Sequence, residues 1–487
     1  MRIVVVGGGM VGHRFAQEAV RLDPGADVVV VGEEPYEPYN RVLLSEVVAG
    51  RSDLSAVVLP EAPGVGRRRG VRAVGVDLAA RHLELDDGAR VTWDHLVLAT
   101  GARARVLPLP GLEAGDGRLV IGAHVLRTID DARGVVAGAV NATRACVVGA
   151  GAIGVEVACG LRGRGLEVTV LASRDGVLDR DLDPRVSAVA TRSLADLGVH
   201  VVPRAGVRAV EVSHGHVDAV VLEDGSHVPT DLLVLATGSV PRTELAVDAG
   251  LAVGKGVVVD EDLRTSHPDV SAIGDCAETP DGVSGLVAPG WAQAAALAER
   301  LLRDRPVAPV PVQGAALRLK AVGLDVVTAG VRASTSGPDD RVVSIDDGGA
   351  RRFVELVVRG GTLVGTTCVG APELAGRLSM LLDRPGIMPP DPLQLLVGVP
   401  DEQVGSPTAM PPSTTVCRCN GVTKAAVLGA WDAGCCTLED VVETTRATTG
   451  CGGCRSLVCG LVEWLQQVDP PSSHEASQER ERGVAAR

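Results

Sequence analysis

The sequence predicts an α/β protein that contains two similar strand–helix–strand units followed by two smaller domains. An apolar run breaks into a glycine-rich turn at residues 7–12 and again at residues 149–154, and a helical pattern follows each turn. A buried-strand pattern that ends in Ala-Thr-Gly also occurs twice, at residues 99–101 and 236–238. We therefore expect one Rossmann-like architecture to be used twice, with one unit nested within the chain of the other.

The first unit has the order of elements that a dinucleotide-binding fold requires. The apolar run 3–6 leads into the glycine turn, a helical segment follows, and a second apolar run at 28–31 precedes two glutamates. The first glycine permits the tight turn, the second lets a pyrophosphate approach the backbone, and the third lets helix and strand pack closely, while an acid accepts from ribose hydroxyls. The amides at the helix N-terminus attract the phosphates. The predicted binding residues are Gly7, Gly9, Gly12, Glu33 and Glu34.

The second unit repeats this pattern with one difference. Its glycines are Gly149, Gly151 and Gly154, and its second strand is expected at residues 167–171. After that strand the chain reads Ala-Ser-Arg, ending at Arg174, where an NAD site usually has an acid. An arginine here can accept the 2′-phosphate of NADP or can be an ordinary surface residue, so both NADH and NADPH stay open. Two such units imply two nucleotides, one held tightly and one exchanging.

Three further segments supply candidate cofactor contacts. A loop at residues 38–46 carries an arginine that can reach a cofactor phosphate or face solvent, and it contains no cysteine, which excludes the redox-active pair of flavin disulfide reductases. Each Ala-Thr-Gly lets the chain turn close beside a bound cofactor. A buried strand then delivers Gly-Asp ahead of a helix, where a carboxylate can hold polyol hydroxyls. The candidates are Arg41, Thr100, Gly101, Gly238, Gly274 and Asp275.

Seven of the eleven cysteines lie between residues 417 and 459, and four of them form two close pairs. Two short helices, expected at 423–433 and 438–447, would bring the pairs together. Four thiolates in two pairs can hold one small metal centre, and the C-x-C spacing of the first pair is less usual for zinc. Glycines 452 and 453 leave backbone amides free to donate to cluster sulfurs. The pattern favours a [2Fe-2S] cluster over structural zinc or unligated thiols, with ligands Cys417, Cys419, Cys451 and Cys454.

The rest of the chain reads as connecting structure. The other cysteines of the cluster region do not fit the pair geometry; they are Cys435, Cys436 and Cys459. A helix is expected at 291–303, and a small mixed domain follows, with short strands at 317–322, 326–329, 353–358 and 363–367 and a helix at 371–382. A proline-rich linker and a charged, disordered tail complete the pattern.

Composition excludes several classes of function. The formal net charge of -14 provides no basic excess for binding nucleic acid. No run of eighteen apolar residues predicts a membrane span, and the N-terminal apolar run belongs to the nucleotide fold rather than to a signal peptide. We therefore expect a cytoplasmic protein, in which clustered cysteines are metal or redox ligands.

Particular motifs resemble those of a known family. Residues 1 to about 400 resemble the FAD-dependent electron-entry portion of bacterial NAD(P)H nitrite reductase large subunits and of the electron transfer subunits of assimilatory nitrate and nitrite reductases, which are related to rubredoxin reductases. The resemblance rests on residues 38–45, 273–278 and 285–291. It implies that Asp275 contacts the ribityl chain of FAD. Residues 416–464 resemble the bacterioferritin-associated-ferredoxin type of [2Fe-2S] domain, which implies the same four cysteine ligands.

The sequence departs from this pattern at two points. Related reductases carry a lysine after the serine of the first loop, near the flavin, where this chain has Glu46. Full nitrite reductase large subunits continue into a sirohaem domain with cysteines spaced C-x5-C and C-x3-C, and neither spacing occurs here. We therefore expect the terminal acceptor to be a separate protein.

The resemblance and the motifs together predict a domain order. An FAD-binding domain is expected at 1–115 and 240–308, an NAD(P)-binding domain at 116–239, a small α+β domain at 309–384, a linker at 385–412, a small helical [2Fe-2S] domain at 413–466 and a disordered tail at 467–487.

Three functions fit this organisation. The first is an electron transfer subunit that oxidises NADH or NADPH and delivers single electrons to a separate nitrite or nitrate reductase. The second is a free-standing NAD(P)H-dependent reductase of a small carrier such as a rubredoxin or ferredoxin, and the third is a redox-sensing binding module. Because the cofactors supply the chemistry, no catalytic side chain is predicted. A homodimer is left open.

Overall fold

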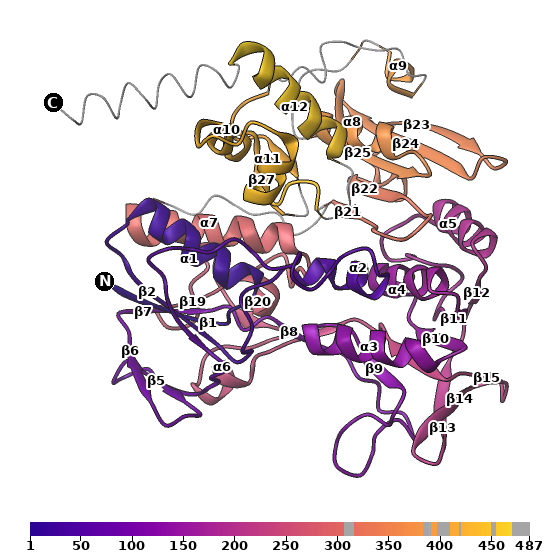
Figure 1. The fold of residues 1–487 in the computed structure, drawn as a ribbon, viewed down its shortest axis with the longest axis horizontal. Coiled ribbons are helices and arrows are strands. Elements are labelled where there is room, and N and C mark those ends of the chain that lie inside the picture. The colour runs from indigo at the N-terminus through magenta and orange to yellow at the C-terminus, as the bar shows by residue number, and fades with distance from the viewer. Residues whose placement is uncertain are drawn as a thin grey trace. The chain divides into compact units, whose positions relative to one another are not determined.

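The computed structural model describes residues 1–305, 316–382, 389, 391–396, 410–417, 420–449 and 454–469. Most of the expected linker and tail lies outside these residues. The described chain forms two compact bodies, an N-terminal body from Met1–Arg180 with Leu194–Ala316, and a C-terminal body from Asp181–Ser193 with the described residues from Leu317 onward (Figure 1). None of the described helices combines the length and apolar composition needed to cross a bilayer.

The N-terminal body contains two five-stranded parallel sheets that correspond in four of their strands. The fifth strand differs, since it is the last of its sheet in the chain in the first sheet and the first of its sheet in the second. The first sheet has the order β19-β7-β1-β2-β3, formed by Val270–Ala272, His95–Leu98, Arg2–Val6, Asp27–Gly32 and Gly66–Arg69. The second has the order β9-β16-β10-β11-β12, formed by Ala123–Val125, Leu232–Leu235, Arg144–Val148, Glu167–Leu171 and Val199–Val202. Because β19 returns to the first sheet after the second sheet is complete, the nested Rossmann-like arrangement is confirmed.

Helices and small sheets complete the N-terminal body. The helices are α1 (Met10–Leu22), α2 (Leu44–Val48), α3 (Ile129–Asn141), α4 (Ala152–Gly163), α6 (Glu244–Asp248) and α7 (Val287–Arg303). Helix α5 (Pro184–Asp196) has residues in both bodies. Two antiparallel sheets are formed by β4 (Ala73–Asp77), β5 (His82–Leu85) and β6 (Arg90–Thr92), and by β13 (Val207–Ser213), β14 (His216–Leu222) and β15 (His227–Pro229). Two-stranded pairs join β8 (Ala102–Ala104) to β17 (Ser239–Pro241) and β18 (Val257–Val258) to β20 (Ala277–Glu278).

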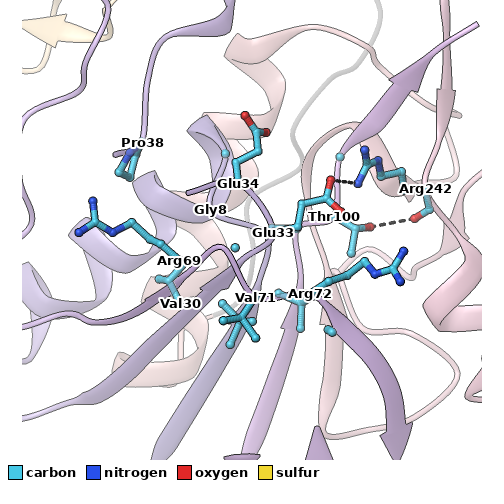
Figure 2. Close-up of a pocket in the computed structure, with 18 of the residues that line it drawn as sticks. Gly8, Val30, Glu33, Glu34, Pro38, Arg69, Val71, Arg72, Thr100 and Arg242 are labelled. Atoms are coloured by element: carbon cyan, nitrogen blue, oxygen red, sulfur yellow. Dashed lines mark hydrogen bonds and ion pairs between the residues drawn. The ribbon is translucent and has the colours of Figure 1, made fainter. Parts of the chain in front are cut away.

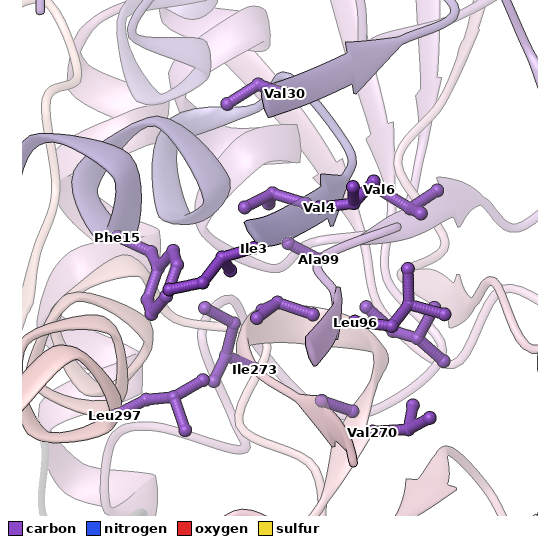
Figure 3. Packing of buried hydrophobic residues seen from close by; sticks show 14 of the residues in the cluster. Ile3, Val4, Val6, Phe15, Val30, Leu96, Ala99, Val270, Ile273 and Leu297 are labelled. Atoms are coloured by element: carbon purple, nitrogen blue, oxygen red, sulfur yellow. The ribbon is translucent and has the colours of Figure 1, made fainter. Parts of the chain in front are cut away.

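The core of the first sheet explains why its strands are almost entirely apolar. Phe15 on α1 and Leu297 on α7 pack against Ile3 and neighbouring strand residues, and all three are fully buried (Figure 3). Parallel strands are covered on both faces, so they read as continuous Val, Ile and Leu runs rather than as alternating patterns. Helix α7 begins at Val287, four residues before the expected start. Pro289 does not prevent this, because the amides of a first turn have no intrahelical partner and proline is tolerated there.

The C-terminal body contains an antiparallel sheet and a small helical domain. The sheet has the order β21-β22-β25-β24-β23, formed by Leu317–Arg318, Val326–Gly330, Thr362–Val369, Arg352–Arg359 and Arg341–Asp347. The helices of this part are α8 (Pro372–Leu382) and α9 (Leu393–Leu396). The helical domain contains β26 (Thr415–Cys417), β27 (Val422–Thr423), α10 (Lys424–Asp432), α11 (Leu438–Thr445) and α12 (Arg455–Val468).

Two expectations for this sheet were wrong. The strand expected at 317–322 is only two residues long, and β23 was not expected at all. Strand β23 lies at the sheet edge and is mostly exposed, so its sequence lacks the apolar signal that identified its buried neighbours.

A buried histidine makes stability depend on pH. His95 on β7 is 6% exposed, and its Nε2 lies 3.1 Å from the hydroxyl of Ser271 on β19. Burial, followed by the charge of Arg300, lowers the pKa of His95 from 6.5 to about 4. The unfolded chain therefore binds this proton at higher pH than the folded chain, and stability is lost as the pH falls from 6.5 towards 4.

We predict that His95→Gln reduces the pH dependence of stability. Between pH 7 and pH 5 the native histidine should account for a loss of about 2 kcal/mol in the free energy of unfolding. Urea titrations of both proteins at the two pH values measure it. The exposed His216→Gln serves as control. An unchanged pH dependence in His95→Gln would contradict the prediction.

Candidate functional site

A cavity of about 650 Å³ lies where the carboxyl ends of β1 and β2 meet the start of α1 (Figure 2). Parallel sheets of this kind bind ligands beyond the carboxyl ends of their strands. The structure brings most of the predicted residues of the first unit to this cavity. The predicted residues that line it are Gly7, Gly9, Glu33, Glu34, Arg41, Thr100 and Gly101.

The first and third glycines of the turn leave no room for side chains. Gly7 has a φ of +121°, and a Cβ there would lie 2.1 Å from the carbonyl oxygen of Ala99. A Cβ on Gly12 would lie 2.1 Å from the carbonyl oxygen of Gly7, so Gly12 sets how closely α1 packs behind the turn. Gly9 is the residue that caps α1, and it offers no side chain to the helix amides. The backbone is thus open to an anionic ligand, which is the cradle that a pyrophosphate requires.

The two acids after β2 have different partners. The carboxylate of Glu34 accepts from the Tyr39 hydroxyl at 2.6 Å and also pairs with Arg41. Glu33 pairs with Arg242, which reaches the cavity from the segment after the second sheet (Figure 2). Burial and the bond to Glu34 raise the pKa of the Tyr39 hydroxyl, so this residue stays a hydrogen-bond donor at neutral pH.

Two backbone hydrogen bonds join Arg242 to the first Ala-Thr-Gly turn. Its amide donates to the carbonyl of Gly101 at 2.9 Å, and its carbonyl accepts from the Thr100 hydroxyl at 2.8 Å. Arg41 is not a solvent-facing side chain, because in addition to its pair with Glu34 it donates to the carbonyl of Arg127 at 3.2 Å.

Asp275 is held differently from the expectation. It lies in a single 3-10 turn, Gly274–Cys276, and the next helix, α7, begins only at Val287, so no helix follows it directly. Neither Gly274 nor Asp275 lines the cavity. Asp275 instead pairs with Arg127 at 2.5 Å, and Arg127 does line the cavity. Sequence reasoning missed Arg127, since the contact spans 148 residues and no local motif marks it.

Glu46, which stands where related reductases carry a lysine, is buried at the contact of α2 with α4. It is 5% exposed and pairs with Arg51 at 2.6 Å. The adjacent Ser45 hydroxyl donates to Glu156 on α4 at 2.5 Å. The contact of α2 with α4 is therefore a hydrogen-bonded joint between the two nucleotide units.

The second unit reproduces the turn of the first. Gly149 has a φ of +111°, and a Cβ there would lie 2.3 Å from the carbonyl oxygen of Ala236. A Cβ on Gly154 would lie 2.0 Å from the carbonyl oxygen of Gly149, and Gly151 caps α4. Gly238 has a φ of +99° with open space around it. The unit thus has the same cradle for a second pyrophosphate.

Part of the predicted cysteine cluster is described. Cys417 is buried in the core of the helical domain, and Cys454, directly before α12, packs against the same core. Cys419 and Cys451 lie outside the described residues, as do the two glycines expected to donate to the cluster. The side chain of Asn420 donates to the carbonyl of Arg446 at 2.6 Å and lies 3.1 Å from the Thr449 hydroxyl.

This asparagine explains how the two cysteine pairs can meet. Asn420 directly follows the first pair in sequence, and Thr449 lies two residues before the second. The helices α10 and α11, joined at Gly434 with a φ of +99°, carry the chain back to make this contact. The contact brings together the residues that follow the first cysteine pair and those that precede the second. Among the described residues no three potential ligands come together, as expected when two of the four are outside them.

Comparison with known proteins decides the family. The model of the pyridine nucleotide-disulphide oxidoreductases matches residues 1–296. The chain belongs to this family. The model of the BFD-like [2Fe-2S] binding domain matches residues 415–464. The chain accordingly combines a pyridine nucleotide-disulphide oxidoreductase part with a BFD-like [2Fe-2S] binding domain.

Two curated relatives are similar over nearly the whole chain. The assimilatory nitrate reductase electron transfer subunit of Bacillus subtilis (strain 168) is 31% identical over 95% of this chain and 60% of its own length. The nitrite reductase [NAD(P)H] large subunit of Klebsiella oxytoca is 33% identical over 95% of this chain and 49% of its own length. The chain thus spans about half to three fifths of these relatives. A solved ferredoxin reductase from Rhodopseudomonas palustris is 27% identical, with a TM-score of 0.70, over 81% of this chain and 96% of its own.

We predict that Gly154→Ala impairs NAD(P)H oxidation but leaves FAD bound. The new Cβ would push α4 away from the second turn, while the first turn is untouched. Stopped-flow absorbance measures flavin reduction, and the flavin-to-protein absorbance ratio measures FAD retention. Gly163→Ala, on the same helix with open space around it, is the control. Normal flavin reduction in Gly154→Ala would contradict the assignment.

We predict that Asn420→Ala lowers the iron and sulfide content of the purified protein. The loop after the first cysteine pair would lose its hydrogen bonds to the loop before the second, and the four thiolates would be less well assembled. Iron and labile sulfide assays measure it, with FAD content expected to stay constant. The exposed Asn141→Ala should keep its full iron content. Equal iron in all three proteins would refute this role.

Proposed function

We propose that this chain is the electron transfer component that oxidises NAD(P)H and delivers single electrons to a separate nitrite or nitrate reductase. The observation that carries the proposal is the pairing of two nucleotide units with a [2Fe-2S] domain in one chain. The relatives that share both parts over 95% of the chain are named as nitrate and nitrite reductase components. The similarity to the ferredoxin reductase structure spans only 81% of the chain.

The proposal assigns FAD to the cavity of the first unit. The turn formed by Gly7, Gly9 and Gly12 receives the pyrophosphate. Glu33 is the acid that accepts from the ribose, because Glu34 is already held by two neighbours, Tyr39 and Arg41. Arg127 lines the cavity and orients Asp275 towards the ribityl chain. The remaining predicted contacts are Thr100 and Gly101, which lie at the next turn of the backbone, and Gly274, which precedes Asp275.

The proposal assigns the exchanging nicotinamide nucleotide to the second unit. Its pyrophosphate lies on the turn formed by Gly149, Gly151 and Gly154, with Gly238 close by. The cluster is held by Cys417, Cys419, Cys451 and Cys454. The proposed domains are FAD-binding at 1–115 and 240–308, NAD(P)-binding at 116–239, α+β at 309–384 and [2Fe-2S] at 413–466, with a linker at 385–412 and a tail at 467–487.

The chain itself provides binding and positioning rather than acid–base chemistry. When bound, FAD supplies the exchange between two-electron and one-electron transfer, and the cluster supplies one-electron transfer. The backbone cradles hold the two nucleotides, and the hydrogen-bonded joint of Ser45 with Glu156 ties the helix of the first unit to that of the second. A fixed relation between the two units is what hydride transfer needs, because reacting atoms must meet at close range.

A free-standing carrier reductase is the second candidate. The similarity to a ferredoxin reductase over 96% of that protein favours it. The two candidates differ in the acceptor, so assays with a nitrite or nitrate reductase and with a rubredoxin or ferredoxin separate them. A redox sensor would not turn over rapidly with an artificial one-electron acceptor.

We predict that Cys454→Ser separates the two halves of the reaction. NAD(P)H should still bleach the flavin absorbance, because the nucleotide units are intact, whereas electron delivery to the partner reductase should fall to background. Absorbance follows the flavin, electron paramagnetic resonance follows the cluster, and nitrite or ammonium production follows delivery.

Cys459→Ser is the control, since this half-buried thiol of α12 is outside the predicted ligand set. Undiminished delivery by Cys454→Ser without a cluster signal would exclude the relay. Delivery only to a rubredoxin or ferredoxin would favour the second candidate.

A further inference from the structure

Backbone hydrogen bonds align the two nucleotide units residue by residue at the ends of their second strands. In the first unit the amide of Val71 donates to the carbonyl of Gly32 at 3.1 Å. In the second unit the amide of Ala205 donates to the carbonyl of Ala172 at 2.8 Å. Gly32 and Ala172 are therefore equivalent, and the residues after each can be compared directly.

The next bond extends the alignment by two residues. The amide of Gly70 donates to the carbonyl of Glu34 at 3.1 Å, and the amide of Arg204 donates to the carbonyl of Arg174 at 2.9 Å. The equivalent pairs are thus Glu33 with Ser173, Glu34 with Arg174, and Gly70 with Arg204. In each unit the loop after the second strand is hydrogen-bonded to the loop after the third strand, but the charged residues on these loops differ.

This difference falls where the adenosine would lie. Glu33, Glu34 and Val71 all line the cavity of the first unit, so their equivalents border the same place in the second. There the second unit has lost both carboxylates and gained two arginines. A carboxylate at this position accepts from the 2′-hydroxyl of NAD, whereas arginine accommodates the 2′-phosphate of NADP.

The backbone of Arg204 keeps the conformation of its equivalent in the first unit. Gly70 has a φ of +67° and Arg204 keeps a φ of +51° at the equivalent position. Glycine adopts this left-handed conformation freely, and a residue such as arginine rarely does. The first unit uses the less strained residue at this place.

Two acids are the present partners of these arginines. Arg174 Nε lies 3.1 Å from Asp179, and Arg204 pairs with Asp175. The arginine side chains are 64% and 77% exposed. Exposed pairs of this kind are weak, so a phosphate dianion can replace or share the carboxylates.

We propose that the second unit selects NADPH over NADH through a 2′-phosphate site formed by Arg174 and Arg204, with the exposed hydroxyl of Ser173 beside them. This inference rests on the proposed function, in which the second unit binds the nicotinamide nucleotide. It adds the identity of the nucleotide and the residues that select it.

Binding of nucleotide fragments to the FAD-loaded full chain tests the site without turnover. The probes are 2′,5′-ADP and 5′-AMP, which differ only in the 2′-phosphate, titrated by calorimetry. We expect 2′,5′-ADP to bind at least about tenfold more tightly, as a charge-assisted hydrogen bond provides. Arg174→Ala and Arg204→Gly should each remove most of this difference. Arg204→Gly restores the residue of the first unit, so its backbone is unstrained.

The matched control is Arg118→Ala, which removes another exposed arginine paired with an acid, Asp116. The double change Ser173→Glu with Arg174→Ala rebuilds the acid of the first unit and should turn the kcat/KM preference towards NADH. Equal binding of the two probes to the native protein, or a preference for NADH, would overturn the inference while leaving the proposed function intact. Failure of both NADH and NADPH to reduce the flavin would overturn the proposed function instead.

Discussion

The contact of a glycine turn with the neighbouring strand is the constraint on which both nucleotide units depend. In each unit the first glycine lies against the carbonyl of the Ala-Thr-Gly strand end, and the third glycine lies against the first. Any side chain at these positions would meet backbone atoms at about 2 Å. The close approach places a helix N-terminus and free amides at the carboxyl edge of the sheet, where phosphates bind.

The same backbone then supports two different electrostatic environments. In the first unit two glutamates follow the second strand, and they pair with Arg41 from the following loop and with Arg242 from the segment after the second sheet. In the second unit the equivalent loops carry Arg174 and Arg204, and these pair with two aspartates of the loop after the second strand. Because the backbones match, the proposed choice of nucleotide in each unit rests on the charges that differ.

Much of the fold was predictable because its signals are local. The continuous apolar strands, the glycine spacings and the cysteine pairs each occupy a few adjacent residues, and the structure confirms the nested sheets that they predict. Edge strand β23 was missed because an exposed strand has no apolar pattern. Arg127 and Arg242 were missed because they reach the cavity from segments far along the chain, and nothing in their own neighbourhood indicates a ligand.

Short-range spacing was enough to predict the two glycine turns, the acid after the first of them and the four-cysteine pattern. Three contacts needed the tertiary structure: Glu34 with Tyr39 and Arg41, Asp275 with Arg127, which lines the cavity, and the backbone hydrogen bond of Arg204 to Arg174. These contacts join residues from different loops, and the distance between loops is fixed by the pairing of the strands that carry them.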